Sequence, residues 1–272
     1  MKVIAREPSE AFAHALSTHP ERNRIDPSRA VVQHRAFVEA LEACEADVVR
    51  LAPDPRFPDA CFVSDTIVAL APPGGGASTV ALVPTRPGAA SRRDEVAPVL
   101  ECARSLVRAD TAVVAVEEPG TLDAGDVIVY GDRMAIGVSA RTNRAGAEQL
   151  ARVAERLGYR TFLCPVDDRL HLASAVTVVR SDRLVGTPSG FASLDAGGAD
   201  AAPEGEIERV IVPEEEVEGA NVLSLHGTCF VAAGYPSASR ALRAAGESVV
   251  EVDLGEFTRA DGGPTCLVAL IP

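Results

Sequence analysis

One succession of secondary structure recurs along this chain and restricts its possible folds more than any other feature. The stretch DVIVYGDRMAIGVSARTNRAGAEQLARVAERLGYRTFLCPV reads as strand, turn, strand, loop, helix and strand. Its helix ends at Gly158 and is predicted by apolar residues spaced three or four positions apart, namely Ala147, Leu150, Ala151, Ala154 and Leu157. The later stretch NVLSLHGTCFVAAGYPSASRALRAAGESVVEVD follows the same order.

The same order of elements can be traced in the rest of the chain. The stretch DTIVALAPPGGGASTVALVPTRPGAASRRDEVAPVLECA reads as two strands, a loop and a helix, and TAVVAVEE supplies the next strand. A helix over residues 29–43 leads into the strand ADVVRLAP, and SAVTVVRSDRLVGTP forms a further hairpin. We expect PPGGGAST to be a hairpin turn, because it lacks the Gly-Lys-Ser/Thr ending of a phosphate-binding loop, and DAGGADAAPEGE to be a surface loop.

About five such modules fill the 272 residues. Strand-rich modules that recur in this way are typical of a radial arrangement around a centre rather than of a doubly wound sheet. The sequence therefore predicts an α/β fold of radially arranged modules. We expect a single domain over residues 1–272.

Charge and cysteine content argue against several classes of function. The net charge of −13 argues against a nucleic acid or an anionic membrane surface as a partner. No apolar run reaches the roughly 18 residues of a membrane span, and Arg6, Glu7 and Pro8 lie where a signal peptide would be apolar. The six cysteines are scattered without a CxxC pair, which argues against a zinc cluster or a redox pair. We therefore expect a cytoplasmic protein with reduced cysteines.

Polar residues gather where the strand pattern breaks. They are Asp59 and Asp65 in FPDACFVSD, Arg86 in TRPGAASRRDE, Asp123 and Asp126 in TLDAGDV, Arg141 in SARTN, His171 in RLHLAS and Cys266 in DGGPTC. Each has a purely structural explanation, since cysteine and histidine are often buried and aspartate often caps turns. Considered together, a cysteine and a histidine oriented by a carboxylate form a nucleophilic arrangement, and arginines with aspartates can bind a zwitterionic amino acid. Both readings remain open at this point.

These stretches, in this order, resemble the dimethylarginine dimethylaminohydrolase family of the guanidino-group-modifying enzymes. The resemblance extends from VIAREPSEAF to the final strand, and its most specific stretches include FPDACFVSD, PGTLDAGDV, SARTNRAGAEQL, LHLAS and DGGPTC. It implies a five-bladed α/β propeller of ββαβ modules around a central active site. It also implies hydrolysis of methylated arginine to citrulline and an alkylamine without a metal or an organic cofactor. The expected partner is a small guanidino amino acid, and a homodimer is a candidate assembly.

The resemblance further implies a role for each polar residue. Cys266 would be the nucleophile, His171 the general acid and base, and Asp123 the carboxylate that orients the histidine. Other residues would hold the two ends of the substrate: Arg86 and Arg141 at the α-carboxylate, Asp59 and the backbone near Leu16 at the α-ammonium, and Asp65 at the guanidinium. A bound guanidinium would favour the thiolate, which an unperturbed thiol of pKa about 8.5 rarely forms at neutral pH.

The chain departs from the family pattern at two positions. Ser64 stands where the family usually has an acidic residue that helps to hold the guanidinium, and Ala173 stands where it usually has lysine. Loss of a charge-assisted hydrogen bond at Ser64 would weaken binding by roughly 1.5–3 kcal/mol. Three functions are therefore compatible with the sequence: hydrolysis of methylated arginine, a related reaction (arginine deiminase, amidinotransferase or hydrolase of another substituted arginine), and a binding paralogue without turnover.

Overall fold

The computed structural model describes residues 1–74, 80–198 and 207–272, so most of the predicted PPGGGAST turn and DAGGADAAPEGE loop lies outside the described residues. Five three-stranded sheets share one order, in which the first strand pairs antiparallel with the second and the second pairs in parallel with the third. Four of them follow one another along the chain: β3 (Ile67–Leu70), β4 (Ala81–Pro84) and β5 (Ala112–Val113); β6 (Val127–Tyr130), β7 (Arg133–Val138) and β8 (Arg160–Pro165); β9 (Val176–Arg180), β10 (Arg183–Gly186) and β11 (Glu208–Ile211); β12 (Leu223–Leu225), β13 (Thr228–Ala232) and β14 (Ser248–Val252).

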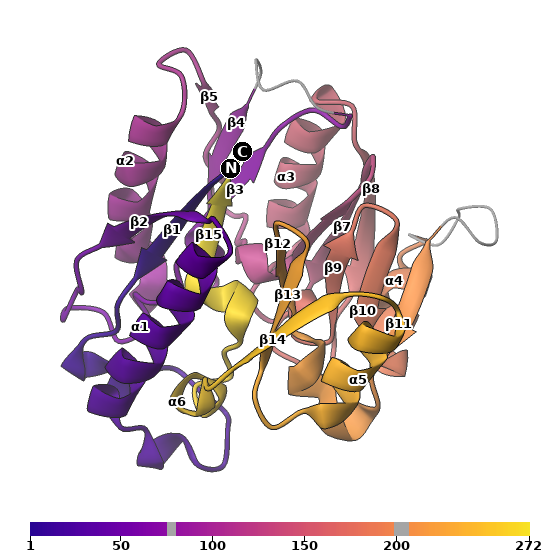
Figure 1. Ribbon diagram of the computed structural model, residues 1–272. Helices are drawn as coiled ribbons and strands as arrows, with labels where there is room; N and C mark the ends of the chain where they lie inside the picture. Colours follow the sequence, from indigo (N-terminus) through magenta and orange to yellow (C-terminus); the bar gives the residue numbers. More distant parts are fainter. Residues whose placement is uncertain (75–79, 199–206) are drawn as a thin grey trace.

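The remaining sheet is assembled from both ends of the chain. Strand β15 (Val268–Ile271) pairs antiparallel with β1 (Lys2–Arg6), and β1 pairs in parallel with β2 (Asp47–Leu51). The N and C termini therefore lie side by side (Figure 1). This pairing completes the fifth module, so the predicted radial α/β arrangement of ββαβ units is confirmed.

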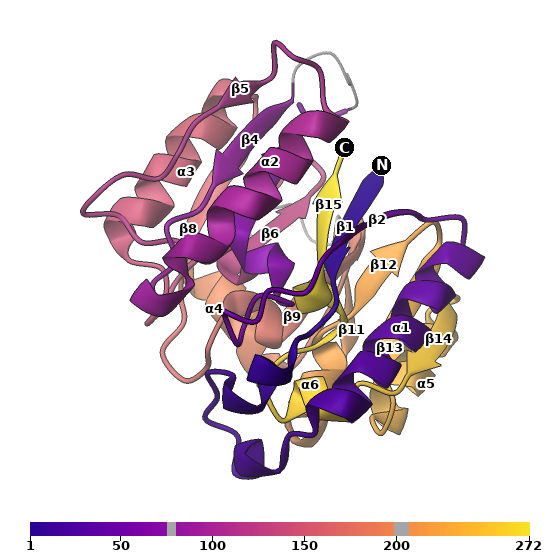
Figure 2. The same cartoon turned by 90° about the vertical axis from the view of Figure 1, so that its left-hand side faces the viewer.

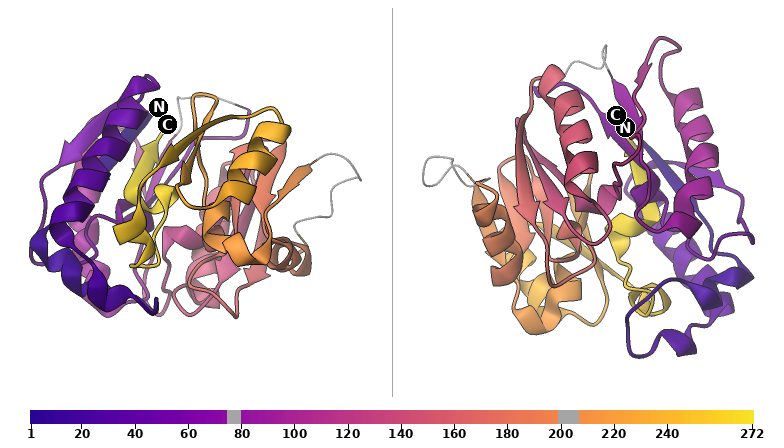
Figure 3. Two further views of the ribbon diagram at one scale, coloured as in Figure 1. Left: turned by 60° about the horizontal axis from the view of Figure 1, so that its bottom comes forward. Right: turned by 180° about the vertical axis from the view of Figure 1, so that it is seen from behind.

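Each module carries one helix between its second and third strands. These helices are α1 (Pro27–Ala43), α2 (Val96–Leu106), α3 (Arg144–Arg156), α4 (Pro188–Ala196) and α5 (Pro236–Ala244), and a short α6 (Gly255–Thr258) follows β14. They lie on the outside of the molecule (Figures 2 and 3). Helix α1 begins two residues before the predicted start, because Asp26 accepts hydrogen bonds from the backbone of Ser28 and Arg29 and Pro27 fits the first turn. No helix in the described ranges has the length and apolar character to cross a membrane.

The cores lie between the helices and the sheets. The second strands, such as β7, are buried on both faces, which explains their continuous apolar runs. On α3, the predicted apolar stripe faces inward, and Leu150 shares a core with Met134 and Ile136 of β7. Full burial of one such leucine stabilises the fold by roughly 1.5–3 kcal/mol.

Five short 3₁₀ segments form the centre of the molecule, and each precedes the first strand of a sheet. They are η3 (Val63–Thr66), η5 (Ala124–Asp126), η6 (Leu172–Ser174), η7 (Glu214–Ala220) and η8 (Pro264–Leu267). Segment η3 contacts η5 and η8, η5 contacts η6, and η6 contacts η7. We call these five segments the central ring. The first strands continue from it, so residues far apart in the sequence meet at the ring.

Candidate active site

A polar pocket lies at the central ring. Its lining includes Asp65 of η3, Cys266 of η8, and Asp123 and His171, which immediately precede η5 and η6. Four segments that are distant in the sequence thus each place one polar side chain in the same pocket. The structure therefore brings together the thiol, the imidazole and two carboxylates that the sequence analysis singled out.

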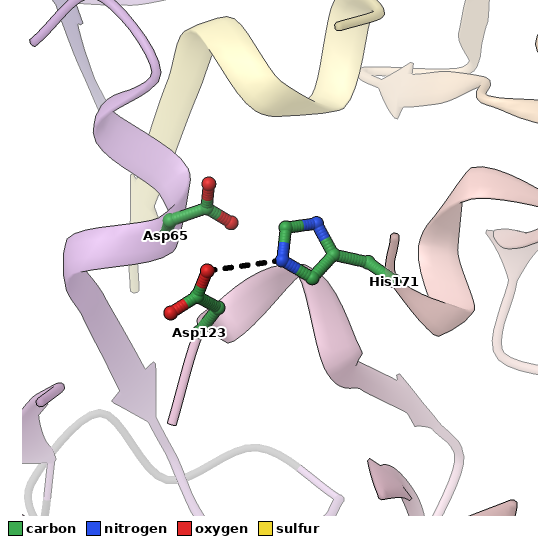
Figure 4. A group of neighbouring side chains, drawn as sticks. All are labelled: Asp65, Asp123 and His171. Atoms are coloured by element: carbon green, nitrogen blue, oxygen red, sulfur yellow. Dashed lines mark hydrogen bonds and ion pairs between the residues drawn. The ribbon is translucent and has the colours of Figure 1, made fainter. Parts of the chain in front are cut away.

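His171 and Asp123 form a buried pair. Their Nε2 and Oδ2 atoms lie 3.1 Å apart, and the side chains are 7% and 0% exposed (Figure 4). The backbone N–H of Gly88 donates to the other carboxylate oxygen of Asp123 at 2.9 Å. The imidazole is therefore held by an anchored carboxylate, and its second nitrogen, Nδ1, points away from Asp123.

The charges around His171 favour its protonated form. Burial lowers the pKa of His171, but the charge of Asp65, the hydrogen bond that His171 donates to Asp123 and the charge of Asp126 outweigh burial and raise this pKa to about 9. Burial raises the pKa of Asp65, but the charges of His171 and Arg92 outweigh burial and lower this pKa below its usual value. At neutral pH the pair is thus an imidazolium beside carboxylates, which can donate a proton.

Cys266 lies in a turn that holds its thiol. The backbone N–H of Gly263 approaches Sγ at 3.4 Å, and the backbone N–H of Cys266 donates to the Gly263 carbonyl at 3.1 Å. Burial and the charge of Asp65 raise the pKa of the thiol to about 11, against the smaller lowering effect of the Gly263 N–H. The unliganded protein therefore holds a thiol rather than a thiolate at neutral pH.

The raised pKa predicts slow alkylation of Cys266 in the absence of substrate. Only the thiolate reacts, so the rate constant for inactivation by iodoacetamide should rise about tenfold per pH unit from pH 7 to 10 without levelling off. The measurement is residual activity against time at each pH, with the modified residue identified by peptide mapping. A rate that reaches its plateau by pH 8 would contradict the assignment.

Sequence reasoning missed a buried ion network behind Asp65. Arg92, only 5% exposed, pairs with Asp65 at 2.6 Å and with Glu95 at 3.0 Å, and it donates to the carbonyl of Phe62 at 3.0 Å. Burial raises the pKa of Glu95 to about 7, although Arg92 opposes this effect. The i,i+3 spacing of an arginine and a glutamate in TRPGAASRRDE was the available signal. Arg92 fixes the Asp65 carboxylate at the pocket.

The sequence analysis also missed Asn221. This residue lies at η7, the segment of the central ring for which no site residue was predicted. It immediately follows η7, and its Oδ1 accepts hydrogen bonds from the backbone N–H and the hydroxyl of Thr265, both at 3.0 Å. Its Nδ2 donates to the Ala173 carbonyl at 3.2 Å and lies 3.9 Å from Sγ of Cys266. A single amide thus ties the Cys266 turn to η6.

Removal of this amide should misplace the thiol. In Asn221→Ala, two donors on Thr265 lose their acceptor, which should lower the free energy of unfolding by about 1–3 kcal/mol. A displaced nucleophile should also lower kcat by about tenfold to a hundredfold. Urea unfolding and initial rates measure the two effects. A stability loss without any change in kcat would assign Asn221 a purely structural role.

The mouth of the pocket is covered by an N-terminal loop. The backbone N–H of Leu16 donates to Asp59 Oδ1 at 3.0 Å, and that of Thr18 donates to Asp261 Oδ2 at 2.7 Å. Leu16, Asp59, Asp261 and Arg141 all line the pocket. Burial raises the pKa of Asp59, against the effects of Arg92, the Leu16 N–H and Arg141. The predicted residues Leu16, Asp59 and Arg141 thus meet at the mouth.

Two predicted residues lie elsewhere. Arg86 is not among the described residues that line the pocket, because its guanidinium pairs with Glu118 and donates to the Gly120 carbonyl at 3.2 Å. Ser64 lines a different, central cavity, because adjacent residues on a 3₁₀ segment point in different directions and its neighbour Asp65 takes the pocket side. The structure therefore gives no support to the expected contact of Ser64 with a guanidinium.

The pocket suits a cationic ligand. Four aspartates, Asp59, Asp65, Asp123 and Asp261, line it, against Arg92, Arg141 and His171. The ligand atoms of Asp65, Asp123 and His171 lie within 4.8 Å of one another, close enough to bind one metal ion. These atoms already take part in the His171–Asp123 and Asp65–Arg92 pairs, however. The arrangement can hold a cation beside a thiol and an oriented imidazole.

Comparisons with known proteins identify close relatives of the chain. No model of a known protein family matches it. It is 34% identical over 266 residues to N(G),N(G)-dimethylarginine dimethylaminohydrolase of Pseudomonas aeruginosa, which covers 97% of each chain. It is 38% identical over 273 residues to the protein of the same name from Streptomyces coelicolor, which covers 98% of this chain and 95% of the relative.

Solved structures agree with these relatives. A mutant of the P. aeruginosa enzyme in complex with citrulline superposes with a TM-score of 0.85 at 30% identity and covers 98% of this chain and 97% of that one. The N-terminal domain of the cyanobacterial arginine dihydrolase ArgZ has a TM-score of 0.81 at 19% identity, covers 98% of this chain and 96% of that one, and shares the fold. The chain belongs to the dimethylarginine dimethylaminohydrolase family.

Proposed function

We propose that this protein hydrolyses N-omega-methylated arginine, such as dimethylarginine and monomethylarginine, to citrulline and an alkylamine. The observation that carries the proposal is the convergence of Cys266, the His171–Asp123 pair and the buried Asp65 in one pocket. The family supports it, since both close relatives are named for the hydrolysis of dimethylarginine. A solved structure of a relative contains citrulline, the expected product.

The amino acid end of the substrate binds at the mouth of the pocket. Arg141, which has no ion-pair partner among the described residues, donates hydrogen bonds to the α-carboxylate, and Arg86 joins it after leaving Glu118. The α-ammonium binds the Asp59 carboxylate and the carbonyl of Leu16. The guanidinium then reaches the inner carboxylate of Asp65, whose lowered pKa keeps it ionised. The two cationic groups of the substrate are thus each paired with an aspartate of the pocket, Asp59 and Asp65.

The bound cation activates the thiol. It offsets the charge of Asp65, which otherwise raises the pKa of Cys266. The thiol gives up its proton to solvent as the cation binds. The thiolate then attacks the guanidino carbon and forms a C–S bond, which gives a tetrahedral adduct. His171, protonated at neutral pH, transfers its proton to the departing nitrogen, the C–N bond breaks, and the amine leaves. The product of this half-reaction is a thiouronium on Cys266.

The second half-reaction uses the same histidine as a base. The neutral imidazole accepts a proton from water, and the hydroxide adds to the thiouronium carbon. The C–S bond then breaks, the hydroxyl proton of the adduct passes to the Cys266 sulfur, and citrulline and the Cys266 thiol are formed. Asp123 keeps the imidazole in the same orientation in both half-reactions.

Product analysis over a panel of arginine derivatives tests the proposal. We expect equal amounts of citrulline and dimethylamine from asymmetric dimethylarginine, and citrulline and methylamine from monomethylarginine. Ammonia from unmodified arginine would instead identify a deiminase, and transfer to an added amine would identify an amidinotransferase. No product from any derivative would identify a binding protein without turnover.

The assembly and the cellular setting remain predictions. We propose that residues 1–272 act as a single catalytic domain in the cytoplasm, since the chain is acidic and its six cysteines lack a CxxC pair. A homodimer is tested by size-exclusion chromatography with light scattering.

A further inference from the structure

A second cavity lies at the central ring, apart from the polar pocket. It has a volume of about 500 Å³ and is larger than the pocket that holds Cys266. Its walls are the first strands of the five sheets, β3, β6, β9, β12 and β15, which contribute mainly valine, isoleucine, leucine and alanine. Arg180 is the one charged side chain among the described residues that line it. We call this cavity the central channel.

The central ring separates the channel from the pocket by a single layer of residues. At three ring segments, one residue lines the pocket and its neighbour in the sequence lines the channel. The residues on the pocket side are Asp65, Asp123 and Cys266, and their neighbours on the channel side are Ser64, Ala124 and Thr265. On the fourth segment, His171 lines the pocket and Ala173 lines the channel. The residues that form this end of the channel are small and uncharged. We call this end the channel floor.

His171 lies directly against the channel floor. Gly125 lines the channel, and a Cβ atom added to it would come within 2.7 Å of His171 Nδ1 and 2.9 Å of Asp65 Oδ1. The imidazole is thus separated from the channel only by the thickness of a glycine backbone. The departing nitrogen of the substrate, which receives its proton from His171, therefore lies next to the channel.

The order of the reaction steps indicates that the amine needs a way out of the pocket other than the mouth. The first half-reaction leaves the amino acid part of the substrate bound to Cys266, in line with the mouth, where Leu16, Asp261 and Gly262 cover the pocket. The amine is formed at the inner end, behind this covalent intermediate. It must leave before water can take its place. Exit through the mouth would require it to pass the bound amino acid and the covering loop.

We propose that the amine crosses the channel floor beside Gly125 and leaves through the central channel. This inference rests on the proposed function. Proton transfer from His171 to the departing nitrogen breaks the C–N bond and yields a neutral amine. A neutral dimethylamine or methylamine has apolar methyl groups, which suit walls of valine, leucine and alanine. It gains its second proton from solvent after it has passed the channel.

The sequence supports this route at the channel floor. Ser64 and Ala173, the two departures from the family pattern, both line the channel. The floor therefore carries two small neutral side chains, where the family usually has an acid and a lysine. Among the described residues, a neutral amine meets no charged side chain at the channel floor.

Filling the channel away from the ring tests the proposal. Ala69 of β3 lines the channel wall, and Ala69→Phe narrows it without touching the catalytic side chains. We expect kcat for dimethylarginine to fall about tenfold, and kcat for monomethylarginine to fall less, because amine release becomes limiting and depends on amine size. Ser224→Leu, on β12 across the channel, is a second variant that should act in the same direction if Ala69→Phe does not fold.

The matched control is Ala36→Phe, which adds the same side chain on the exposed face of α1. It should retain the wild-type ratio of the two kcat values. The alkylation rate of Cys266 should be unchanged in the channel variants, since their pocket is intact. Wild-type kcat ratios in the folded channel variants would overturn the channel proposal. Failure of the wild-type protein to release dimethylamine would instead overturn the proposed function.

Discussion

Replacement of Cys266 by serine should lower the rate of amine release by at least about a thousandfold, because a hydroxyl does not ionise near neutral pH and is a far weaker nucleophile. The fold should survive, since the side chains are nearly isosteric and a serine hydroxyl can accept the hydrogen bond from the Gly263 backbone. The measurement combines dimethylamine release with thermal unfolding of the same preparation.

The matched control is Cys102→Ser, which changes a half-buried cysteine of α2 outside the pocket. This variant should retain full activity. Appreciable amine release by Cys266→Ser, with Cys102→Ser also active, would refute the assignment of the nucleophile. Loss of activity in both variants would show that neither result reports on the chemistry.

The second large effect is expected for Asp123→Asn. The carboxamide can no longer provide the charge that holds His171 Nε2–H, and an amide NH₂ facing Nε2 favours the other tautomer. We expect kcat to fall by roughly 10²–10⁴-fold, as for carboxylates that orient a catalytic histidine. Loss of this hydrogen bond and charge also lowers the pKa of His171 from about 9. The falling limb of the pH–rate profile should therefore move to lower pH.

A comparison with Asp126→Asn separates charge from orientation. The charge of Asp126 also raises the pKa of His171, but its carboxylate binds the backbone of Leu172 and the hydroxyl of Ser139 instead of the imidazole. This variant should shift the pH profile in the same direction with a smaller loss of kcat. Equal losses of kcat in the two variants would contradict the orienting role of Asp123.

The order of elements could be predicted from the sequence because each module encodes it locally. Apolar strands, turns with glycine and a helical stripe such as that of α3 recur, so the ββαβ unit is legible. By contrast, local patterns do not show which strands form the sheet of β15, β1 and β2. Strand β15 joins β1 across the whole length of the chain, and only the closed ring of modules makes this pairing necessary.

The site was predictable to the extent that a motif marks its residues. Cys266, His171, Asp123 and Asp65 come from distinct stretches, and the fold brings them into one pocket. The side of the central ring that a residue faces was not predictable, because it depends on the direction of one side chain on a short 3₁₀ segment. Ser64 therefore appeared as a substrate contact but lines the channel.

The supporting residues were hidden for a different reason. Arg92 reads as one of several surface arginines until its burial beside Asp65 and Glu95 is known. Asn221 follows an acidic segment with no resemblance to a catalytic motif, and its two hydrogen bonds to Thr265 depend on contacts between modules. Long-range packing, not local pattern, gives both residues their place.

The covalent intermediate on Cys266 is the central claim, and mass spectrometry of the protein during turnover tests it most directly. The protein is mixed with dimethylarginine, quenched in acid at successive times, digested and mapped. We predict an adduct with the mass of the thiouronium on the peptide that contains Cys266, which appears after dimethylamine is released and decays as citrulline forms. Full turnover with Cys266 unmodified at every time, or an adduct confined to another cysteine, would contradict the proposed mechanism.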